Sequence, residues 1–459
     1  MNFVEELRWR GMLHDIMPGT EELLNKGMAS GYIGFDPTAD SLHVGHLTQI
    51  MTLIHFQRAG HKPYALVGGA TGMVGDPSGK SAERNLLSED VLNHNLKSVQ
   101  AQLEKFLDFN SGTNSAQMVN NYDWFKNITF LDFIRDVGKH LTVNYMMAKD
   151  SVKKRLEGDT GMSFTEFTYQ LVQGYDFYYL WKHNNCVLQM GGSDQWGNIV
   201  TGTELIRRKD QGEAFALTTQ LIKKADGTKF GKTESGAVWL DKKKTSSFDF
   251  YKFWFNTSDE DAKSYIRIFT LLERQYIIYL EEKHNQEPNL RILQKELAEQ
   301  ITARVHGLDS LRMIAKSNQF TYNPEFSWSD LFDLTEKQFL EVFSSTNLFF
   351  ISGEAFIKYV LEDNVMYLLG EIHNYDELGN YKRMFESKNE AKKMVLNGGV
   401  YINKIKILLE DRISDYKLFL NKYLFVQKGK KNSALVIFCD DVEEEQNRIH
   451  SLFNNPNII

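Results

Sequence analysis

The sequence predicts an α/β protein with a parallel-sheet domain first, a largely helical region next and a small α+β domain last. Three observations support this prediction. Short apolar runs that end in Gly- and Asp-rich turns alternate with helical periodicity, which is typical of strand–helix–strand units. The stretch after residue 247 keeps helical periodicity alone. The last third combines short strand patterns, a Gly-Gly turn and an excess of Lys and Arg.

Changes in composition and in hydrophobic periodicity along the chain set the predicted domain boundaries. The parallel-sheet domain spans 1–225, and a mobile Lys- and Gly-rich loop follows over 226–246. At 459 residues the chain is long for one domain, so several units are expected. The remaining segments are a helical region at 247–320, a linker at 321–334, an α+β domain at 335–439 and a polar helix or tail at 440–459.

Composition narrows the class of protein. The chain is 42% hydrophobic and 25% charged, as in ordinary globular proteins. No apolar run approaches 18 residues, and the N-terminus lacks a basic segment followed by an apolar core. We therefore expect a cytoplasmic protein with neither a signal peptide nor a membrane span. Cys186 and Cys439 are too few for a disulfide framework or a Cys-type zinc site.

Charge is unevenly distributed. Between Tyr381 and Lys431 there are thirteen Lys or Arg and five acidic residues, a net charge of +8. The whole chain carries −7, so the remainder carries −15. A basic module on an acidic body suggests that this module meets a polyanion, although a merely solvated lysine-rich surface is the alternative.

The first element of the predicted site is the stretch 32–46, YIGFDPTADSLHVGH. Residues 32–35 are predicted to form a short buried strand, which the Asp-Pro-Thr turn at 36–38 ends. Asp40 or Ser41 is then expected to cap a helix that runs through both histidines.

His43 and His46 are three residues apart, so a helix would place both imidazoles on one face of its first turn. Gly45 between them leaves room for a flat group near the backbone. A helix N-terminus with flanking imidazoles suits a phosphate group. An isolated H-x-x-H pair is more often coincidental or metal-binding, so the prediction depends on the rest of the chain.

Two further strands end in comparable loops. The predicted strand 63–67 leads into the Gly-rich segment 68–80, which presents Asp76, and the strand 186–190 leads into 191–198. Neither segment is a P-loop or a dinucleotide motif; Val74 stands where a P-loop needs glycine. If the strands are parallel, these loops converge with the 36–38 turn at the edge of the sheet where such folds bind ligands.

A later helix carries Tyr169, Gln173 and Asp176 at i, i+4 and i+7, so a phenol, an amide and a carboxylate share one face. Core packing is the alternative for Tyr169. A buried Asp176 on that face would need a partner. In the basic loop, Lys229 and Lys232 are either solvent-exposed charges or groups that close over phosphates.

Seven motifs in this order and spacing resemble the bacterial-type tyrosyl-tRNA synthetases of class I. They are His43-Val44-Gly45-His46, Lys229-Phe230-Gly231-Lys232-Thr233, Asp36-Pro37-Thr38, GGATG at 68–72, GDPSGK at 75–80, Tyr169-x-x-x-Gln173-x-x-Asp176 and GSDQWGN at 192–198. The resemblance implies a Rossmann-like catalytic domain, a helical anticodon-recognition domain and an α+β RNA-binding domain.

The resemblance also implies a reaction. Tyrosine and ATP form tyrosyl-adenylate and pyrophosphate, and the tyrosyl group then passes to the 3′-terminal adenosine of tRNA(Tyr). ATP is expected to bring Mg²⁺, no structural metal is expected, and the family forms homodimers. The apolar helices between Thr129 and Phe164 are the expected interface.

The resemblance assigns roles to individual residues. The tyrosine-binding set is Tyr32, Asp76, Tyr169, Gln173, Asp176 and Gln195. The catalytic set is Thr38, His43, His46, Lys80, Arg84, Lys229 and Lys232. The ATP-binding set is Gly34, Asp36, Pro37, His43, Gly45, His46, Gly192, Asp194, Lys229, Phe230, Gly231, Lys232 and Thr233. The RNA-binding set is Lys388, Lys392, Lys393, Lys404 and Lys406.

The C-terminal module departs from the family pattern in two ways. Lysines replace the usual arginine pair, and Gly370–Arg383 resembles an insertion before the module. Three alternatives to the main function remain: a tryptophanyl-tRNA synthetase, a small-molecule adenylyltransferase with the same H-x-G-H signature, and an RNA-binding protein with an inactive site. Tyr32 and Asp176 argue against the first, and two RNA-binding domains argue against the second.

Overall fold

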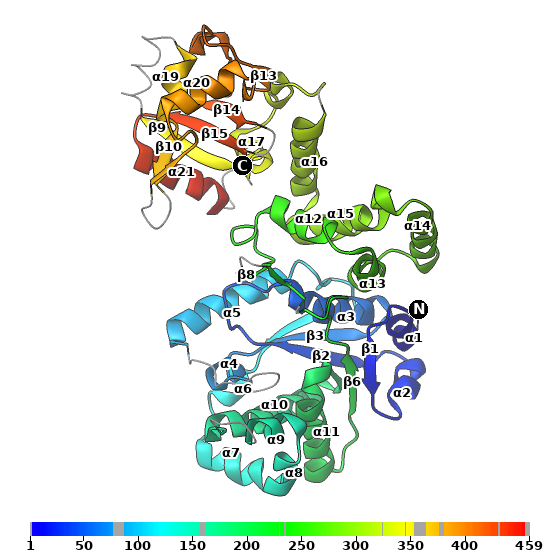
Figure 1. Ribbon diagram of the computed structural model, residues 1–459. Coiled ribbons are helices and arrows are strands. Elements are labelled where there is room, and N and C mark those ends of the chain that lie inside the picture. Colours follow the sequence, from blue (N-terminus) through cyan, green and yellow to red (C-terminus); the bar gives the residue numbers. More distant parts are fainter. Residues whose placement is uncertain are drawn as a thin grey trace. The chain divides into compact units, whose positions relative to one another are not determined.

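The computed structural model describes residues 2–76, 87–156, 161–228, 230–233, 236–323, 325–344, 346–352, 364–375, 381–429 and 432–454 (Figure 1). The chain divides into two compact units. The first consists of Met1–Lys244 and Lys252–Val305, and the second of Thr245–Tyr251 and His306–Ile459.

The first unit is built on a six-stranded sheet in the order β1-β6-β5-β2-β3-β4. The strands from β6 to β4 run parallel, and only β1 is antiparallel to its neighbour, β6. The strands are β1 (Leu13–Ile16), β2 (Ser30–Phe35), β3 (Lys62–Val67), β4 (Gln117–Asn120), β5 (Cys186–Gly192) and β6 (Phe215–Thr219). The predicted parallel sheet and its strands at 32–35, 63–67 and 186–190 are confirmed.

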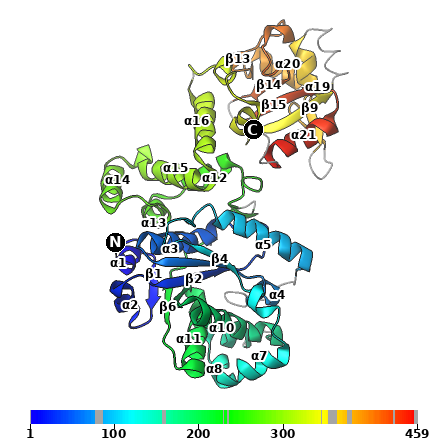
Figure 2. The same ribbon diagram turned by 180° about the vertical axis from the view of Figure 1, so that it is seen from behind.

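Helices cover both faces of this sheet, as Figures 1 and 2 show from opposite sides. On one face α3 (Leu47–Arg58) and α5 (Glu89–Leu103) pack against β3; on the other α10 (Phe164–Asn184) and α11 (Trp196–Asp210) pack against β5 and β6. The core between sheet and α10 includes Tyr32, Phe177 and Leu180. Burial on both faces explains why the central strands are continuous apolar runs.

The start of the helix that follows β2 differs from the prediction. A 3₁₀ turn, Val44–His46, precedes α3, and His43 is its N-cap, whereas Asp40 and Ser41 are not caps. The chain stays extended here because Val44 and Leu240 donate backbone hydrogen bonds that tie it to the 238–240 segment. The Ser41 hydroxyl instead donates to the Leu42 carbonyl.

The segment after Thr129 is broken into short helices: α7 (Phe130–Asp136), α8 (Val143–Met147) and α9 (Asp150–Leu156), with a 3₁₀ turn at Gly138–His140. The sequence predicts one apolar stripe of Phe133, Ile134, Val137 and Leu141 along a continuous helix. In the structure Val137 and Leu141 are buried, whereas Ile134 is 45% exposed, because α7 ends at Asp136.

The region 247–320 is helical, as expected, and comprises α12 (Ser247–Phe255), α13 (Asp259–Phe269), α14 (Arg274–Gln286), α15 (Ile292–His306) and α16 (Leu308–Tyr322). Its contacts do not make it a separate unit. α13 and α14 belong to the first unit and α16 to the second. No helix in the described part of the chain is both long and apolar enough to cross a membrane.

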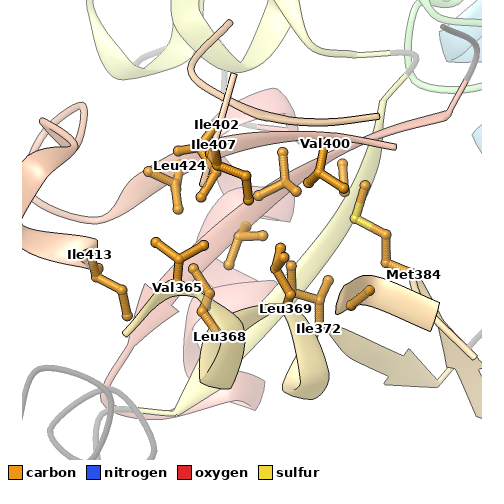
Figure 3. Close-up of a cluster of buried hydrophobic side chains, with 14 of the residues drawn as sticks. Val365, Leu368, Leu369, Ile372, Met384, Val400, Ile402, Ile407, Ile413 and Leu424 are labelled. Carbon is orange, nitrogen blue, oxygen red and sulfur yellow. The ribbon is translucent and has the colours of Figure 1, made fainter. Parts of the chain in front are cut away.

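The second unit contains a five-stranded sheet in the order β13-β12-β14-β15-β9. Its strands are β9 (Asn347–Ser352), β12 (Val400–Ile402), β13 (Ile405–Lys406), β14 (Tyr423–Lys428) and β15 (Asn432–Cys439); its helices are α17 (Glu336–Val342), α19 (Val365–Glu371), α20 (Lys388–Leu396) and α21 (Val442–Asn454). Figure 3 shows side chains of α19 facing those of the sheet in one buried cluster. Within the 370–383 segment, β10 (His373–Tyr375) pairs with β11 (Tyr381–Arg383).

Two segments predicted to be a linker and a polar helix or tail are integrated into this unit. In 321–334, Trp328 and Leu331 are buried in a second core cluster, which also contains Phe339 and Phe343. In 440–459, α21 buries Ile449 in the same cluster. Aromatic and aliphatic residues at helical spacing outweigh the polar composition that suggested a linker.

Candidate active site

The predicted ligand-binding edge is present in the first unit. The carboxyl ends of β5, β2 and β3, which are neighbours in the sheet, open into a cavity of about 250 Å³. Thirteen of the residues predicted from sequence line it: Tyr32, Gly34, Asp36, Thr38, Gly45, His46, Asp76, Tyr169, Gln173, Asp176, Gly192, Asp194 and Gln195. The convergence of three loops is therefore confirmed.

A phenol and a carboxyl group lie buried in this cavity. Tyr32 is 1% exposed, and its hydroxyl has no hydrogen-bond partner in the described chain. Asp176 is also 1% exposed and accepts hydrogen bonds from Asn121 Nδ2 (3.0 Å) and Trp124 Nε1 (2.9 Å). An unpaired buried hydroxyl costs free energy, so Tyr32 is poised for a ligand that supplies the missing partner.

Burial changes the protonation of both groups. It raises the pKa of Asp176 from 3.8 to about 8, against the opposing effect of the hydrogen bonds from Asn121 and Trp124. Burial also raises the pKa of Tyr32 well above its usual value, and the nearby Asp176 charge adds to the shift. Near neutral pH the end of the cavity formed by Tyr32 and Asp176 therefore carries little charge.

A second polar cluster centres on Asp76. Its carboxylate accepts hydrogen bonds from Gln195 Nε2 (2.7 Å) and Asn198 Nδ2 (3.5 Å). Gln173 Nε2 donates in turn to Gln195 Oε1 (3.4 Å). A carboxylate held by amides and lining a cavity is suited to an ammonium group.

Tyr169 and Asp36 form a separate pair. The Tyr169 hydroxyl donates to Asp36 Oδ2 (3.0 Å), and the Thr71 hydroxyl donates to Asp36 Oδ1 (2.7 Å). Burial, followed by the Asp36 charge, raises the pKa of Tyr169 well above its usual value. The sequence placed Tyr169 in the tyrosine-binding set and Asp36 in the ATP-binding set, whereas the structure joins the two by a hydrogen bond.

The two histidines adopt fixed orientations. The Gly45 N–H donates to His43 Nδ1 (3.0 Å), the His43 N–H donates to His46 Nδ1 (3.1 Å), and the ring centroids are 4.1 Å apart. A neutral ring that accepts at Nδ1 carries its proton on Nε2, which makes it a donor for phosphate oxygens. Gly45 is required because a Cβ there would lie 2.7 Å from His43 Cε1. His46 lines the cavity, whereas His43 and Pro37 do not.

The KFGKT motif at 229–233, here called the second signature, approaches the H-x-G-H turn at Gly231. A Cβ on Gly231 would approach Val44 Cγ2 to 2.9 Å, so glycine permits this contact. Phe230 was expected to bind ATP, but its ring packs among aromatic side chains and does not line the cavity. Its neighbours, with centroids 5.1–5.9 Å away, are Phe253, Trp254, Tyr265 and Phe269. Phe230 thus anchors the loop.

The other loop residues are described only in part. The backbone of Lys232–Thr233 forms β7, which pairs with β8 (Gly236–Ala237). Lys80, Arg84 and Lys229 lie outside the described residues.

The sequence prediction did not include several groups that shape the cavity. Asn121 and Trp124 orient Asp176, and Thr71 orients Asp36. Gln49 and Gln189 line the cavity, and each has a buried Oε1 atom with no partner in the described chain. Gln49 lies on α3, Gln189 on β5 and Thr71 on α4 (Thr71–Val74), whereas Asn121 and Trp124 lie at the start of α6 (Tyr122–Phe125). Of these residues only Thr71 belongs to a quoted motif, GGATG at 68–72. Only the assembled sheet brings them together.

The lysines predicted to bind RNA lie in the second unit. Lys392 and Lys393 are exposed on α20, and Lys406 is exposed on β13. Lys388 is also exposed, with its Nζ 5.1 Å from the Tyr367 ring centroid. Lys404 differs, because its Nζ donates to the carbonyls of Asn323 (2.8 Å) and Phe326 (2.9 Å). The Lys404 ammonium therefore links the turn after β12 to the 323–326 segment, and these hydrogen bonds leave it poorly placed to contact RNA.

Within the described ranges, no group of three or more His, Cys, Asp or Glu is arranged to hold a metal ion.

The sheet-edge cavity, the H-x-G-H turn and the adjoining second signature define a class I aminoacyl-tRNA synthetase. A family described as tRNA synthetases class I (W and Y) matches residues 25–321, and the chain belongs to it. It is 56% identical over 439 residues to a tyrosine–tRNA ligase of Cytophaga hutchinsonii, covering 95% of this chain and 99% of that one. A tyrosine–tRNA ligase of Porphyromonas gingivalis is 55% identical over 441 residues, covering 95% and 100%.

A solved structure agrees with these relatives. A C-terminally truncated mitochondrial tyrosyl-tRNA synthetase of Aspergillus nidulans is similar with a TM-score of 0.63 and 32% identity. The similarity covers 69% of this chain and 93% of that one.

Proposed function

We propose that the protein is a tyrosine–tRNA ligase, which activates L-tyrosine with ATP and transfers it to the 3′ end of tRNA(Tyr). The observation that carries the proposal is the buried pair of Tyr32 and Asp176 in the cavity. The phenol of tyrosine would supply the partner that the Tyr32 hydroxyl lacks. Phenylalanine would leave the Tyr32 hydroxyl buried and unpaired, and an indole would not match the Tyr32–Asp176 pair.

The opposite end of the substrate meets the Asp76 cluster. We assign Asp76, Gln173 and Gln195 to the tyrosine ammonium group, because a carboxylate and amide oxygens accept its hydrogen bonds. Tyr169 acts through Asp36, which it holds in place. These contacts orient the tyrosine carboxylate toward the nucleotide.

The activation step needs no general base. The tyrosine carboxylate is already an anion; one of its oxygens bonds to the α-phosphorus of ATP, and the bond to pyrophosphate breaks. The protein therefore contributes positioning and stabilisation of phosphate charge. We assign that stabilisation to the Nε2–H groups of His43 and His46, with Thr38 beside them.

The remaining phosphate contacts are assigned by family resemblance. Lys229 and Lys232, with Lys80 and Arg84, would close over the leaving pyrophosphate. Mg²⁺ would arrive bound to ATP, as it does in phosphoryl-transfer enzymes generally. Gly34, Gly192 and Asp194 line the cavity where the nucleotide would lie.

The second unit would bind tRNA through its basic surface. Lys388, Lys392, Lys393 and Lys406 remain from the predicted set, since Lys404 is used internally. Replacing Lys392 and Lys393 together with glutamine should raise the KM for tRNA about tenfold at physiological salt. Tyrosine-dependent exchange should not change. Unaltered charging kinetics in the double variant would contradict this role for α20.

We also propose a homodimer and a cytoplasmic role in translation. The helices α7 and α8 expose apolar side chains, among them Phe130 and Leu131, which is 76% exposed. Such a patch on a chain of this size is typical of a protein–protein interface. We expect Leu131→Glu to convert the dimer to a monomer in analytical ultracentrifugation, with Leu290→Glu, an exposed leucine elsewhere, as control. A dimer of unchanged affinity would exclude this surface.

ATP–pyrophosphate exchange with each of the twenty amino acids tests the activation step. Tyrosine alone should support exchange. Exchange with tryptophan would keep the fold but overturn the substrate assignment. Exchange with no amino acid would leave an RNA-binding protein as the better description.

A further inference from the structure

A short antiparallel pairing joins the H-x-G-H turn to the segment that follows the second signature. The Val44 N–H donates to the Val238 carbonyl (2.9 Å). The Leu240 N–H donates to the Leu42 carbonyl (2.8 Å). The Val238 N–H donates in turn to the carbonyl of Gly231, inside the second signature (3.1 Å). The backbone of Val238 therefore connects the two signatures.

His43 and Trp239 face each other at the centre of this pairing. The hydrogen bonds flank these two residues and do not join them, which is the arrangement that brings opposed side chains closest together. The centroids of the imidazole and the indole are 6.0 Å apart, and the ring planes meet at 69°. The two rings therefore make an edge-to-face contact.

The indole of Trp239 lies outside the core beneath this pairing. Burial alternates along both segments, because the residues on either side of His43 and Trp239 are buried whereas these two are half-buried. Successive side chains of an extended segment point to opposite faces, so the imidazole and the indole share the face away from the core. Lys244 covers the same indole, with its Nζ 5.4 Å from the ring centroid, and pairs with Asp40 at 2.7 Å.

The orientation of the His43 imidazole depends on its contacts. The last torsion of a histidine side chain has a broad intrinsic preference, so the backbone alone does not fix the plane of the ring. The Gly45 N–H fixes the position of Nδ1 (3.0 Å). The His46 ring, with its centroid 4.1 Å away, and the Trp239 indole then restrict how far the imidazole can tilt about that hydrogen bond.

We infer that Trp239 is a positioning residue for adenylate formation. It holds the His43 imidazole in the orientation that the phosphate contact requires, and the Val238 backbone ties that orientation to the second signature. The inference rests on the proposed function, which assigns His43 to the phosphates of ATP. Trp239 acts through His43 and contacts neither substrate.

Trp239→Leu tests the inference in the full-length protein, with kcat and KM of tyrosine-dependent pyrophosphate exchange as the readout. The variant should lower kcat about three- to tenfold, which is the worth of an edge-to-face contact, and leave the KM for tyrosine unchanged. Trp239→Phe keeps an aromatic ring and should stay within about twofold of the parental kcat. If Trp239→Leu does not fold, Trp239→Met takes its place, because it also removes the aromatic ring.

A double-mutant cycle with His43→Ala separates positioning from a general structural role. If Trp239 acts through the imidazole, adding Trp239→Leu to His43→Ala should change kcat by less than about twofold. A general structural role would lower kcat by the same factor in both backgrounds. That result would overturn the inference, as would an unchanged kcat in Trp239→Leu or a loss confined to the KM for tyrosine.

Trp9→Leu is the matched control. Trp9 is another half-buried indole beside a cation: it ends α1 (Phe3–Trp9), and the Arg274 Cζ lies 4.8 Å from its centroid. Its replacement should leave kcat unchanged in both backgrounds, and an equal loss in Trp9→Leu and Trp239→Leu would contradict the inference. Absence of tyrosine-dependent exchange in the parent would instead count against the proposed function.

Discussion

Asp176→Ala is expected to reduce kcat/KM for tyrosine activation by about 100-fold or more, because the substrate phenol loses a buried partner. The substitution also leaves the Trp124 indole N–H without its acceptor. We therefore expect a loss of about 1–3 kcal/mol in the free energy of unfolding. Pyrophosphate exchange and thermal unfolding measure the two effects separately.

Asp176→Asn is the matched control, because it keeps the volume and one oxygen acceptor for Trp124 or Asn121. It should recover most of the stability and little of the activity. Exchange at the parental rate in Asp176→Ala would show that tyrosine is recognised elsewhere.

The raised pKa of Asp176 also predicts how stability depends on pH. Its folded pKa is about 8 and its unfolded value 3.8, so between these pH values the folded state binds more protons. Stability contributed by this group must then fall as pH rises through that window, by at most about 1.4 kcal/mol per pH unit. Asp176→Asn should remove this slope in urea unfolding measured from pH 5 to 8.

His46→Ala is expected to lower kcat for adenylate formation by about 100-fold while leaving the affinity for tyrosine unchanged. The imidazole accepts a hydrogen bond from the His43 N–H at Nδ1, and His46 lines the cavity. An effect confined to kcat indicates an interaction that forms only as charge develops on the phosphates.

Two amide substitutions of His46 test the roles of its two ring nitrogens separately. His46→Asn places an oxygen near the Nδ1 position, so the turn should remain intact while activity is lost. His46→Gln reaches the Nε2 position and should retain more activity. The reverse ranking in pre-steady-state adenylate formation would assign His46 to holding the turn alone.

The sequence predicted the elements whose signals are local. The buried runs of β2, β3 and β5 and the glycines that follow them gave the parallel sheet and its functional edge. The i, i+4, i+7 spacing on α10 placed Tyr169, Gln173 and Asp176 in one cavity. Strands β1 and β6 were missed, since β1 is a short, partly exposed edge strand and β6 has no distinguishing alternation.

Sequence patterns could not predict the contacts between side chains that are far apart in the chain. Tyr169 and Asp36 are 133 positions apart, and their hydrogen bond exists only because α10 packs beside β2. Lys404 reads as one more basic residue, yet a left-handed backbone turn places its ammonium against the Asn323 and Phe326 carbonyls. Phe230 likewise belongs to the KFGKT motif that was expected to bind ATP, whereas its ring packs in a cluster of aromatic side chains because this buries apolar surface.

Aminoacylation of bacterial tRNA tests the account most directly. The protein, ATP, Mg²⁺, total tRNA and an equimolar mixture of the twenty amino acids would be incubated together, and the amino acid esterified to tRNA would be identified by mass spectrometry. The account predicts tyrosine alone, attached only to tRNA(Tyr). Esterified tryptophan or phenylalanine, or activation of tyrosine without transfer to any tRNA, would contradict it.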